Sequence, residues 1–359
     1  MMKSPRFLHK MTSRYSDGSL RKLRVTAPLT DFISNDYLGL SLVPSKSDSF
    51  THSGTGSRLI SGNSASAEQA ENHISKLFGA ERSLIFNSGY DANLGLFSSV
   101  PQKGEVVLYD ELVHASVRDG VRLSFAESFS FKHNDVTDLA SKLQKYRDRT
   151  VFVAIESYYS MDGDLAPVEE ILGVVADYGA LLVVDEAHTC GVFGMQGLGM
   201  TYAFRDHPSL FARVITFGKA YGAHGGAVLG SEKLIEFLIN FSRSFIYTTA
   251  MPPDAYKRIE YMTRLATEEN KRRERLFANI VAWNQHFEGN PGPIQVVPCT
   301  DKLKLTACVE QAEQLGWALK AVFSPTVPSG KERLRICIHS DHSEKELEEL
   351  ALFIKECIR

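Results

Sequence analysis

Short, nearly continuous apolar runs alternate with segments of helical spacing over the central part of this chain. One run is Val151-Phe-Val-Ala-Ile155, and a second, Leu181-Leu-Val-Val184, follows a segment that begins at Pro167. Strands that are apolar on both faces are typical of a parallel or mostly parallel sheet covered by helices on each side. We therefore predict an α/β fold with a mostly parallel sheet. In such folds ligands bind beyond the carboxyl ends of the strands.

The pattern changes after residue 253, where a long charged helix from about Ala255 to Phe287 is predicted. Beyond it, the spacing predicts strands at 294–297 and 334–338 and helices at 308–315 and 343–358. A chain of 359 residues exceeds one typical domain. We predict an N-terminal segment of residues 1–41, a large domain of residues 42–265 and a small C-terminal α/β domain of residues 266–359.

The composition argues against several classes of partner. A net charge of −3 without a Lys/Arg-rich run gives no reason to expect nucleic acid. The five cysteines are scattered and form no CxxC pair, which indicates neither a disulfide framework nor a metal site and favours a cytoplasmic protein. No apolar run is long enough to span a bilayer, so no membrane association is expected.

The stretch VITFGKAYGAHGG (214–226) places a single lysine among small residues just after a predicted strand. A bulky group can approach the ε-amine of Lys219 closely there, which suits covalent attachment of a carbonyl cofactor. Thr216, three residues earlier, could face the same phosphate-bearing ligand. A Gly-Lys-Ala triplet after a strand is more often an ordinary loop, so the hypothesis depends on partners at other strand ends.

Three such partners follow predicted strands and suit pyridoxal phosphate. Asp185 closes the run 181–184, and a buried carboxylate there would pair with a protonated ring nitrogen. His188 could reach the same ring from the side, and His114, after the strand 105–109, could stack on it. Each has an ordinary alternative as a capping aspartate, a core histidine or a loop histidine.

Phosphate contacts are predicted at Ser88-Gly89-Tyr90, which precedes a helix expected over 92–99. Backbone N–H groups at a helix start bind anions, and Gly89 permits close approach. Ser160 and Thr216 bring hydroxyls to strand ends, where they contact the cofactor or merely cap helices. Each signal is weak singly, but their coincidence at successive strand ends favours one cofactor site.

Nine segments spread over nearly the whole chain carry a resemblance to one family. In order, they are SNDYLGLS (34–41), NSGYDAN (87–93), DELVHASVRDG (110–120), HND (133–135), SMDGDLAP (160–167), DEAHTCGVFGMQGLG (185–199), TFGKAYGAHGG (216–226), IYTTAMPP (246–253) and PTVPSGKERLR (325–335). In these segments the chain resembles the α-oxoamine synthases. These are fold-type I pyridoxal phosphate enzymes, similar in fold to aspartate aminotransferase, which condense an amino acid with an acyl-CoA and release carbon dioxide.

The resemblance implies pyridoxal phosphate as cofactor and assigns roles to the residues above. Lys219 would be the lysine that holds the cofactor covalently, and Asp185 the partner of its ring nitrogen. His114 would be the stacking ring and His188 the contact to the phenolic oxygen. Further cofactor contacts would come from Gly89, Tyr90, Ser160 and Thr216.

Substrate contacts are implied in the same way. Arg335 ends the RLR triplet and matches the family's clamp on the amino acid carboxylate, which a guanidinium binds bidentately. Its ordinary alternative is a strand arginine paired with a surface acid. Thr326, Arg21 and Asn35 match positions associated with substrate binding. The resemblance also implies a homodimer with shared sites, in which Thr248 or Thr249 reaches the cofactor phosphate of the other copy.

Within the family, the chain looks most like the member that joins L-alanine to a pimeloyl thioester in biotin synthesis. PTVP argues against glycine C-acetyltransferase, where PVVP is usual, while 5-aminolevulinate synthase and serine palmitoyltransferase stay open. The remote alternative is a noncatalytic α/β nucleotide-binding protein, although the glycines form no GxGxxG after the first strand.

Two departures from the family pattern stand out. Ala67 replaces the histidine of a common HxxLE pattern, which removes a loop contact but no catalytic group. Phe323-Ser324 stands where some members carry an arginine that could meet the distal acyl carboxylate.

Overall fold

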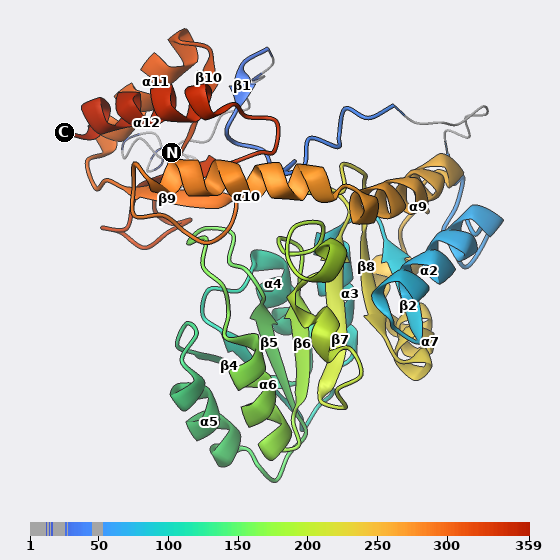
Figure 1. Cartoon of the computed structure of the whole chain (residues 1–359). Coiled ribbons are helices and arrows are strands. Elements are labelled where there is room, and N and C mark those ends of the chain that lie inside the picture. The colour runs from blue at the N-terminus through green and yellow to red at the C-terminus, as the bar shows by residue number, and fades with distance from the viewer. Residues whose placement is uncertain (1–11, 13, 15, 17–25, 27, 45–52) are drawn as a thin grey trace, which may run out of the picture. The chain divides into compact units, whose positions relative to one another are not determined.

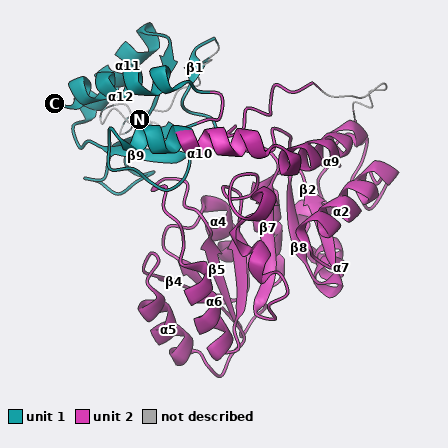
Figure 2. Ribbon diagram, in the orientation of Figure 1, with its two compact units in different colours: residues 1–34, 279–338, 342–359 teal, residues 35–278, 339–341 magenta. Residues whose placement is uncertain are grey.

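The computed structural model describes residues 12, 14, 16, 26, 28–44 and 53–359, so Arg21 lies outside the described residues. Two compact units divide the chain (Figure 2), and each is described by itself. The larger unit contains residues 35–278 and 339–341, and the smaller contains residues 1–34, 279–338 and 342–359. The limits of these units differ from the predicted domain limits, and the three-part organisation stays a prediction.

A seven-stranded sheet forms the centre of the larger unit (Figure 1), in the order β2-β8-β7-β6-β5-β3-β4. Its strands are β2 (Arg82–Phe86), β3 (Val106–Asp110), β4 (Glu127–Phe131), β5 (Val151–Glu156), β6 (Leu181–Asp185), β7 (Leu210–Thr216) and β8 (Gly226–Gly230). Every pairing from β7 to β4 is parallel, while β8 runs antiparallel to both of its neighbours. The predicted mostly parallel sheet is confirmed.

Helices cover both faces of this sheet because its strands are apolar on both sides. They include α2 (Ala65–Phe78), α3 (Gly89–Ser99), α4 (Ala115–Leu123), α5 (Val136–Lys145), α6 (Val168–Asp177), α7 (Glu232–Phe241) and α8 (Arg243–Ile246). On β5, Phe152 and Ala154 join an apolar cluster with α3 and α4, whereas Val153 and Ile155 join a second cluster with α5 and α6. Successive side chains of a strand point to opposite faces, so each face needs its own cover.

Capping groups set where the first helices begin and end. The Ser88 side chain accepts the backbone N–H of Asp91 at 3.0 Å, so α3 begins at Gly89, three residues before the predicted start at Ala92. Helix α2 ends at Gly79, whose φ of 65° is the left-handed conformation that glycine adopts readily.

The prediction of one long helix over 255–287 is wrong, because the segment forms α9 (Pro253–Glu268) and α10 (Asn270–Asn284). Glu269 between them has a ψ of 52°, which is not helical. The guanidinium of Arg273 donates to the carbonyls of Ala266 and Thr267 at the end of α9. Because Arg273 donates to these two carbonyls, the helix can end here without leaving them unsatisfied. Two 3₁₀ turns, η1 (Met195–Gly197) and η2 (Met200–Phe204), lie between β6 and β7.

The smaller unit has an antiparallel sheet in the order β11-β12-β9, and its helices α11 and α12 contact each other. Its elements are β1 (Thr30–Asp31), β9 (Ile294–Pro298), α11 (Lys302–Gln314), β10 (Trp317–Ala318), β11 (Lys320–Val322), β12 (Arg333–Cys337) and α12 (Glu344–Ile358). The two predicted strands and two predicted helices are present. Strands β10 and β11 are too short to leave a pattern in the sequence.

Candidate functional site

Four of the predicted site residues follow the carboxyl ends of parallel strands in the larger unit. Asp185 ends β6 and His188 lies three residues further on, while Lys219 follows β7 and His114 follows β3. The Nζ atom of Lys219 lies 2.7 Å from Nε2 of His188. Because β6 and β7 are neighbouring strands, the loops after them meet, and the structure brings this lysine and histidine together.

The Asp185 carboxylate is 7% exposed and accepts two hydrogen bonds. Asn93 Nδ2 donates to its Oδ2 at 2.7 Å, and the backbone N–H of Ala187 donates to its Oδ1 at 2.9 Å. Hydrogen bonds to the charged form of a carboxyl stabilise that form. Asn93 had no role in the sequence prediction. The sequence feature that could have pointed to Asn93 is its polar side chain between Ala92 and Leu96 on the buried face of α3.

His114 caps helix α4 through its own ring. Nδ1 accepts the backbone N–H of Ser116 at 3.2 Å and lies 2.8 Å from Ser116 Oγ. Burial lowers the pKa of His114, against the opposing charge of Asp185. The imidazole ring of His114 is therefore neutral, and its one ring proton is on Nε2. The Tyr90 ring packs edge-on against it, with the ring centroids 6.3 Å apart.

The start of helix α3 packs closely against the end of β7. A Cβ atom at Gly89 would lie 3.2 Å from Cβ of Thr216, so only glycine fits without displacement. The Thr216 hydroxyl donates to the carbonyl of Gly225 at 3.1 Å. The first backbone N–H groups of α3, including those of Gly89 and Tyr90, have no acceptor within the helix and face an anion favourably.

Thr248 and Thr249 lie beside the end of β2. Asn87 Nδ2 donates to Thr248 Oγ1 at 3.1 Å and to the carbonyl of Thr249 at 3.0 Å. Since Asn87 directly precedes the Ser88 cap, both threonines belong to the surroundings of the α3 start. Ser160 lies in the turn that follows β5.

Glu156 is a buried acid to which the sequence prediction gave no role. It ends β5 in register with Asp185 on β6 and is 3% exposed. Burial raises the pKa of Glu156 well above its ordinary value, and the charge of Asp185 raises it further. The backbone N–H of His114 donates to this carboxyl, while Oε1 has no hydrogen-bond partner among the described residues. A protonated carboxyl fits these surroundings.

The remaining predicted substrate contacts belong to different units. Asn35 is in the larger unit and accepts a hydrogen bond from Tyr37 at 3.0 Å. Arg335 is in the smaller unit on β12, is 7% exposed, and its Nη1 lies 3.0 Å from Cys337 Sγ. Thr326, also in the smaller unit, is exposed, and its N–H donates to the carbonyl of Phe323 at 2.9 Å.

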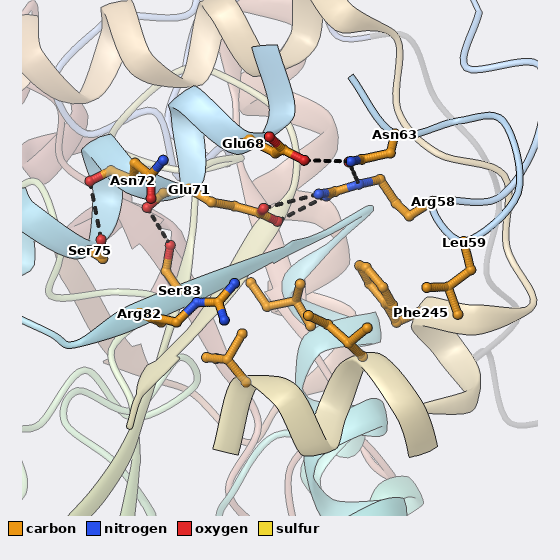
Figure 3. Close-up of a pocket in the computed structure, with 13 residues that line it drawn as sticks. Arg58, Leu59, Asn63, Glu68, Glu71, Asn72, Ser75, Arg82, Ser83 and Phe245 are labelled. Atoms are coloured by element: carbon orange, nitrogen blue, oxygen red, sulfur yellow. Dashed lines mark hydrogen bonds and ion pairs between the residues drawn. The ribbon is translucent and has the colours of Figure 1, made fainter. Parts of the chain in front are cut away.

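A pocket of about 410 Å³ with polar and apolar walls lies beside α2, β2 and α7, and none of the predicted site residues lines it (Figure 3). Arg58 binds Glu71 bidentately at 2.9 and 3.0 Å, with its guanidinium 5.6 Å from the ring centroids of Phe245 and Tyr256. Glu71 also accepts the N–H of Ile85 at 3.0 Å. The charges of Arg58 and Glu71 neutralise each other. Their ion pair anchors the GTGSRLISG loop (54–62) to α2, and Glu71 is bonded in turn to β2.

None of the helices within the described part of the chain combines the length and apolar character that a membrane span requires.

Comparisons with known proteins point to one family. The profile described as "Aminotransferase class I and II" matches residues 27–354. The 8-amino-7-oxononanoate synthase of Emericella nidulans is 37% identical, with 96% of this chain and 93% of that protein covered.

Two solved structures are similar over most of the chain. A serine palmitoyltransferase variant from S. paucimobilis with bound pyridoxal phosphate and myriocin has a TM-score of 0.87 at 25% identity, with 98% of this chain and 96% of that chain covered. An 8-amino-7-oxononanoate synthase from Francisella tularensis has a TM-score of 0.77 at 26% identity, with 92% and 97% covered.

Proposed function

The chain belongs to the aminotransferase class I and II family, and we propose that it joins L-alanine to a pimeloyl thioester with pyridoxal phosphate as its cofactor. The products are 8-amino-7-oxononanoate, carbon dioxide and the free thiol, which makes the protein an acyltransferase of biotin synthesis. The observation that carries the proposal is the convergence of Lys219, His188 and Asp185 at neighbouring strand ends, in a chain 37% identical to a named 8-amino-7-oxononanoate synthase.

The residues present fit pyridoxal phosphate. Asp185 is a buried carboxylate with two hydrogen-bond donors, which suits a protonated ring nitrogen. Gly89 leaves room beside Thr216 that a Cβ would fill, at the start of a helix that favours a phosphate. Lys219 supplies the amine.

Bound pyridoxal phosphate supplies an aldehyde that joins amines and a ring that accepts the electron pair left on the adjoining carbon. Lys219 would hold the cofactor, and its free amine would serve as the base for the Cα proton of alanine. Asp185 would keep a proton on the ring nitrogen, and His114 would supply an aromatic face for the ring. His188, whose Nε2 lies 2.7 Å from Lys219 Nζ, would contact the phenolic oxygen. Tyr90, Ser160 and Thr216 line the cofactor.

Substrate contacts complete the proposal. Arg335 binds the alanine carboxylate, for which a planar guanidinium provides two parallel donors. Asn35, Thr326 and Arg21 contact the substrates. Two copies form a homodimer in which Thr248 or Thr249 contacts the cofactor phosphate of the other copy, in the cytoplasm.

A second acyl substrate has one specific observation in its favour. The fold is more similar to the serine palmitoyltransferase structure than to the Francisella synthase, with TM-scores of 0.87 and 0.77. Phe323 also replaces the cation that would meet a distal acyl carboxylate. L-Serine with a long acyl chain is therefore the second candidate.

A substrate matrix tests the proposal. Alanine, glycine and serine are each combined with pimeloyl, acetyl, succinyl and palmitoyl-CoA, and release of thiol and carbon dioxide is measured. We expect the highest kcat/KM for alanine with pimeloyl-CoA, with a pimeloyl carrier-protein thioester compared as donor. Lys219→Ala is the control and should lose the borohydride-reducible absorbance of the cofactor. A maximum for serine with palmitoyl-CoA supports the second candidate, and a wild-type chain that takes up no cofactor overturns both.

A further inference from the structure

A chain of three hydrogen bonds leads away from Lys219 into the protein interior. Lys219 Nζ lies 2.7 Å from His188 Nε2, and His188 Nδ1 lies 2.7 Å from Tyr37 Oη. Tyr37 Oη in turn donates to Asn35 Oδ1 at 3.0 Å. Tyr37 is fully buried and His188 is 5% exposed. The rings of Tyr37 and His188 therefore form hydrogen bonds with protein groups and are shielded from bulk solvent.

With Oδ1 of Asn35 facing Tyr37 Oη, as in the structure, the three bonds fit one direction of donation. A lysine ammonium has donors only, so Nε2 of His188 must present its lone pair to Lys219. A neutral imidazole then has its proton on Nδ1 and donates it to Tyr37 Oη. Tyr37 has one proton of its own, and it points to Asn35 Oδ1.

The opposite direction loses one of these bonds. If Nε2 held the proton and donated to a neutral Lys219 amine, Nδ1 would need the hydroxyl proton of Tyr37. That proton could not also be donated to Asn35 Oδ1. Asn35 thus sets the direction of all three hydrogen bonds through the hydroxyl of Tyr37.

We propose that Tyr37 is a positioning residue that holds His188 in the tautomer with an unprotonated Nε2, so that His188 takes the proton that the Lys219 ammonium releases before its amine reacts. This inference rests on the proposed function. One N–H bond of Lys219 breaks and leaves its electron pair on nitrogen, and a new N–H bond forms at Nε2. The resulting imidazolium still donates from Nδ1 to Tyr37, and a hydrogen bond to the charged form stabilises it. No other reactant is needed.

Two readouts test the proposal on the full chain. Nitrogen NMR of ¹⁵N-histidine-labelled protein without cofactor reports which ring nitrogen of His188 has the proton, with resonances assigned by their loss in His188→Gln. The second readout is the pH dependence of the rate at which added pyridoxal phosphate forms a borohydride-reducible adduct with Lys219. The variant is Tyr37→Phe. The matched control is Tyr159→Phe, a buried tyrosine whose ring contacts His133 instead.

For the wild type and Tyr159→Phe we expect the proton on Nδ1. For Tyr37→Phe we expect it on Nε2, with adduct formation slower by on the order of tenfold or more near neutral pH and its midpoint moved to higher pH. If Tyr37→Phe does not fold, Asn35→Ala frees the hydroxyl proton of Tyr37 for Nδ1 and should produce the same change of tautomer. A wild-type proton on Nε2, or a Tyr37→Phe profile equal to that of Tyr159→Phe, overturns the proposal.

Failure of the proposed function gives a different result. In that case the wild-type chain forms no reducible adduct, while the NMR spectrum still decides the tautomer of His188.

Discussion

Two buried glutamates, Glu156 and Glu186, lie at the ends of the neighbouring strands β5 and β6 in opposite surroundings. Glu186 is fully buried and pairs with Arg213 at 2.5 Å, and its Oε1 accepts the N–H of Thr201 at 2.8 Å. Within the described part of the chain no cation forms an ion pair with Glu156, and its pKa is raised by burial and by the charge of Asp185. The same residue type is thus an ion-pair partner in one place and an acid with a raised pKa in the other.

We predict that Glu156→Gln leaves the free energy of unfolding unchanged or raises it at neutral pH. Because the pKa of Glu156 in the folded chain is raised well above its ordinary value, folding at neutral pH favours proton uptake by this carboxyl, which lowers stability. Glutamine removes this cost. Glu186→Gln is the matched control and should lower the stability by about 3–5 kcal/mol, since Arg213 is left buried without its counter-charge. Equal losses for both variants in denaturant titrations would contradict the neutral state of Glu156.

The hydrogen bond from Asn93 to Asp185 is predicted to support cofactor binding. Asn93→Ala removes a donor from a buried carboxylate, and a hydrogen bond to a charged group contributes about 1.5–3 kcal/mol. The Kd for pyridoxal phosphate, measured by absorbance titration, should rise roughly tenfold to hundredfold. Asn240→Ala, on α7, removes an exposed asparagine and serves as the control. Identical titrations of the two variants would show that Asp185 does not depend on Asn93.

At the scale of elements, His133 joins three segments that follow strands of the sheet. Its Nδ1 lies 3.0 Å from Asp110 at the end of β3, and its Nε2 lies 2.7 Å from Asp164 in the turn after β5. His133 itself is in the turn between β4 and α5. Burial lowers the pKa of His133, but the hydrogen bonds and charges of Asp110 and Asp164 outweigh burial and raise it to about 10.

The stability of the chain should therefore fall in alkaline solution. Because the pKa of His133 in the folded chain lies above its ordinary value of about 6.5, protonation of this ring stabilises the fold. The stabilisation is complete below that pH and disappears as the pH rises toward about 10. Urea titrations across this interval should show a smaller pH dependence for His133→Gln than for the wild type. His207→Gln, outside this cluster, should retain the wild-type slope. A wild-type stability that stays constant over the interval would rule out an imidazolium at His133.

The Arg58–Glu71 pair holds the loop 54–62 against α2 and β2, and its loss should be costly. Side-chain exposures are 9% and 13%, so Arg58→Ala leaves a nearly buried carboxylate without its counter-charge. We expect a loss of about 3–5 kcal/mol in the free energy of unfolding. Arg82→Ala breaks an exposed pair with Glu232 at 3.7 Å and should cost less than about 1 kcal/mol. Similar losses by calorimetry would mean that the buried pair contributes no more than a surface pair.

At the scale of the whole molecule, the proposed homodimer makes a prediction about mixed variants. Lys219→Ala removes the reacting amine, and a Thr248→Ala/Thr249→Ala double variant removes the contacts to the cofactor phosphate of the other copy. When both chains are expressed together, half of the dimers are mixed, and one of the two sites in each mixed dimer retains all of its groups. Activity should recover to roughly a quarter of the wild-type value. No recovery, with dimers present by sedimentation, would place both threonines in the site of their own chain.

The sequence by itself determined the class of fold and the order of its parts, because both are encoded locally. Apolar runs such as 151–155 predict strands buried on two faces, and the structure has a strand at Val151–Glu156. Lys219, Asp185, His188 and His114 became candidates because each follows a predicted strand, and the family resemblance supplied their expected roles.

Only the tertiary structure decided which side chains meet. Tyr37 and His188 are 151 residues apart, and Asn93 and Asp185 are 92 apart, so no spacing rule connects them. The division between α9 and α10 depends on where the Arg273 guanidinium bonds, and the protonation of Glu156 depends on a neighbouring strand. Hydrogen bonds and desolvation act through space, and their partners are defined only once the sheet has brought distant segments together.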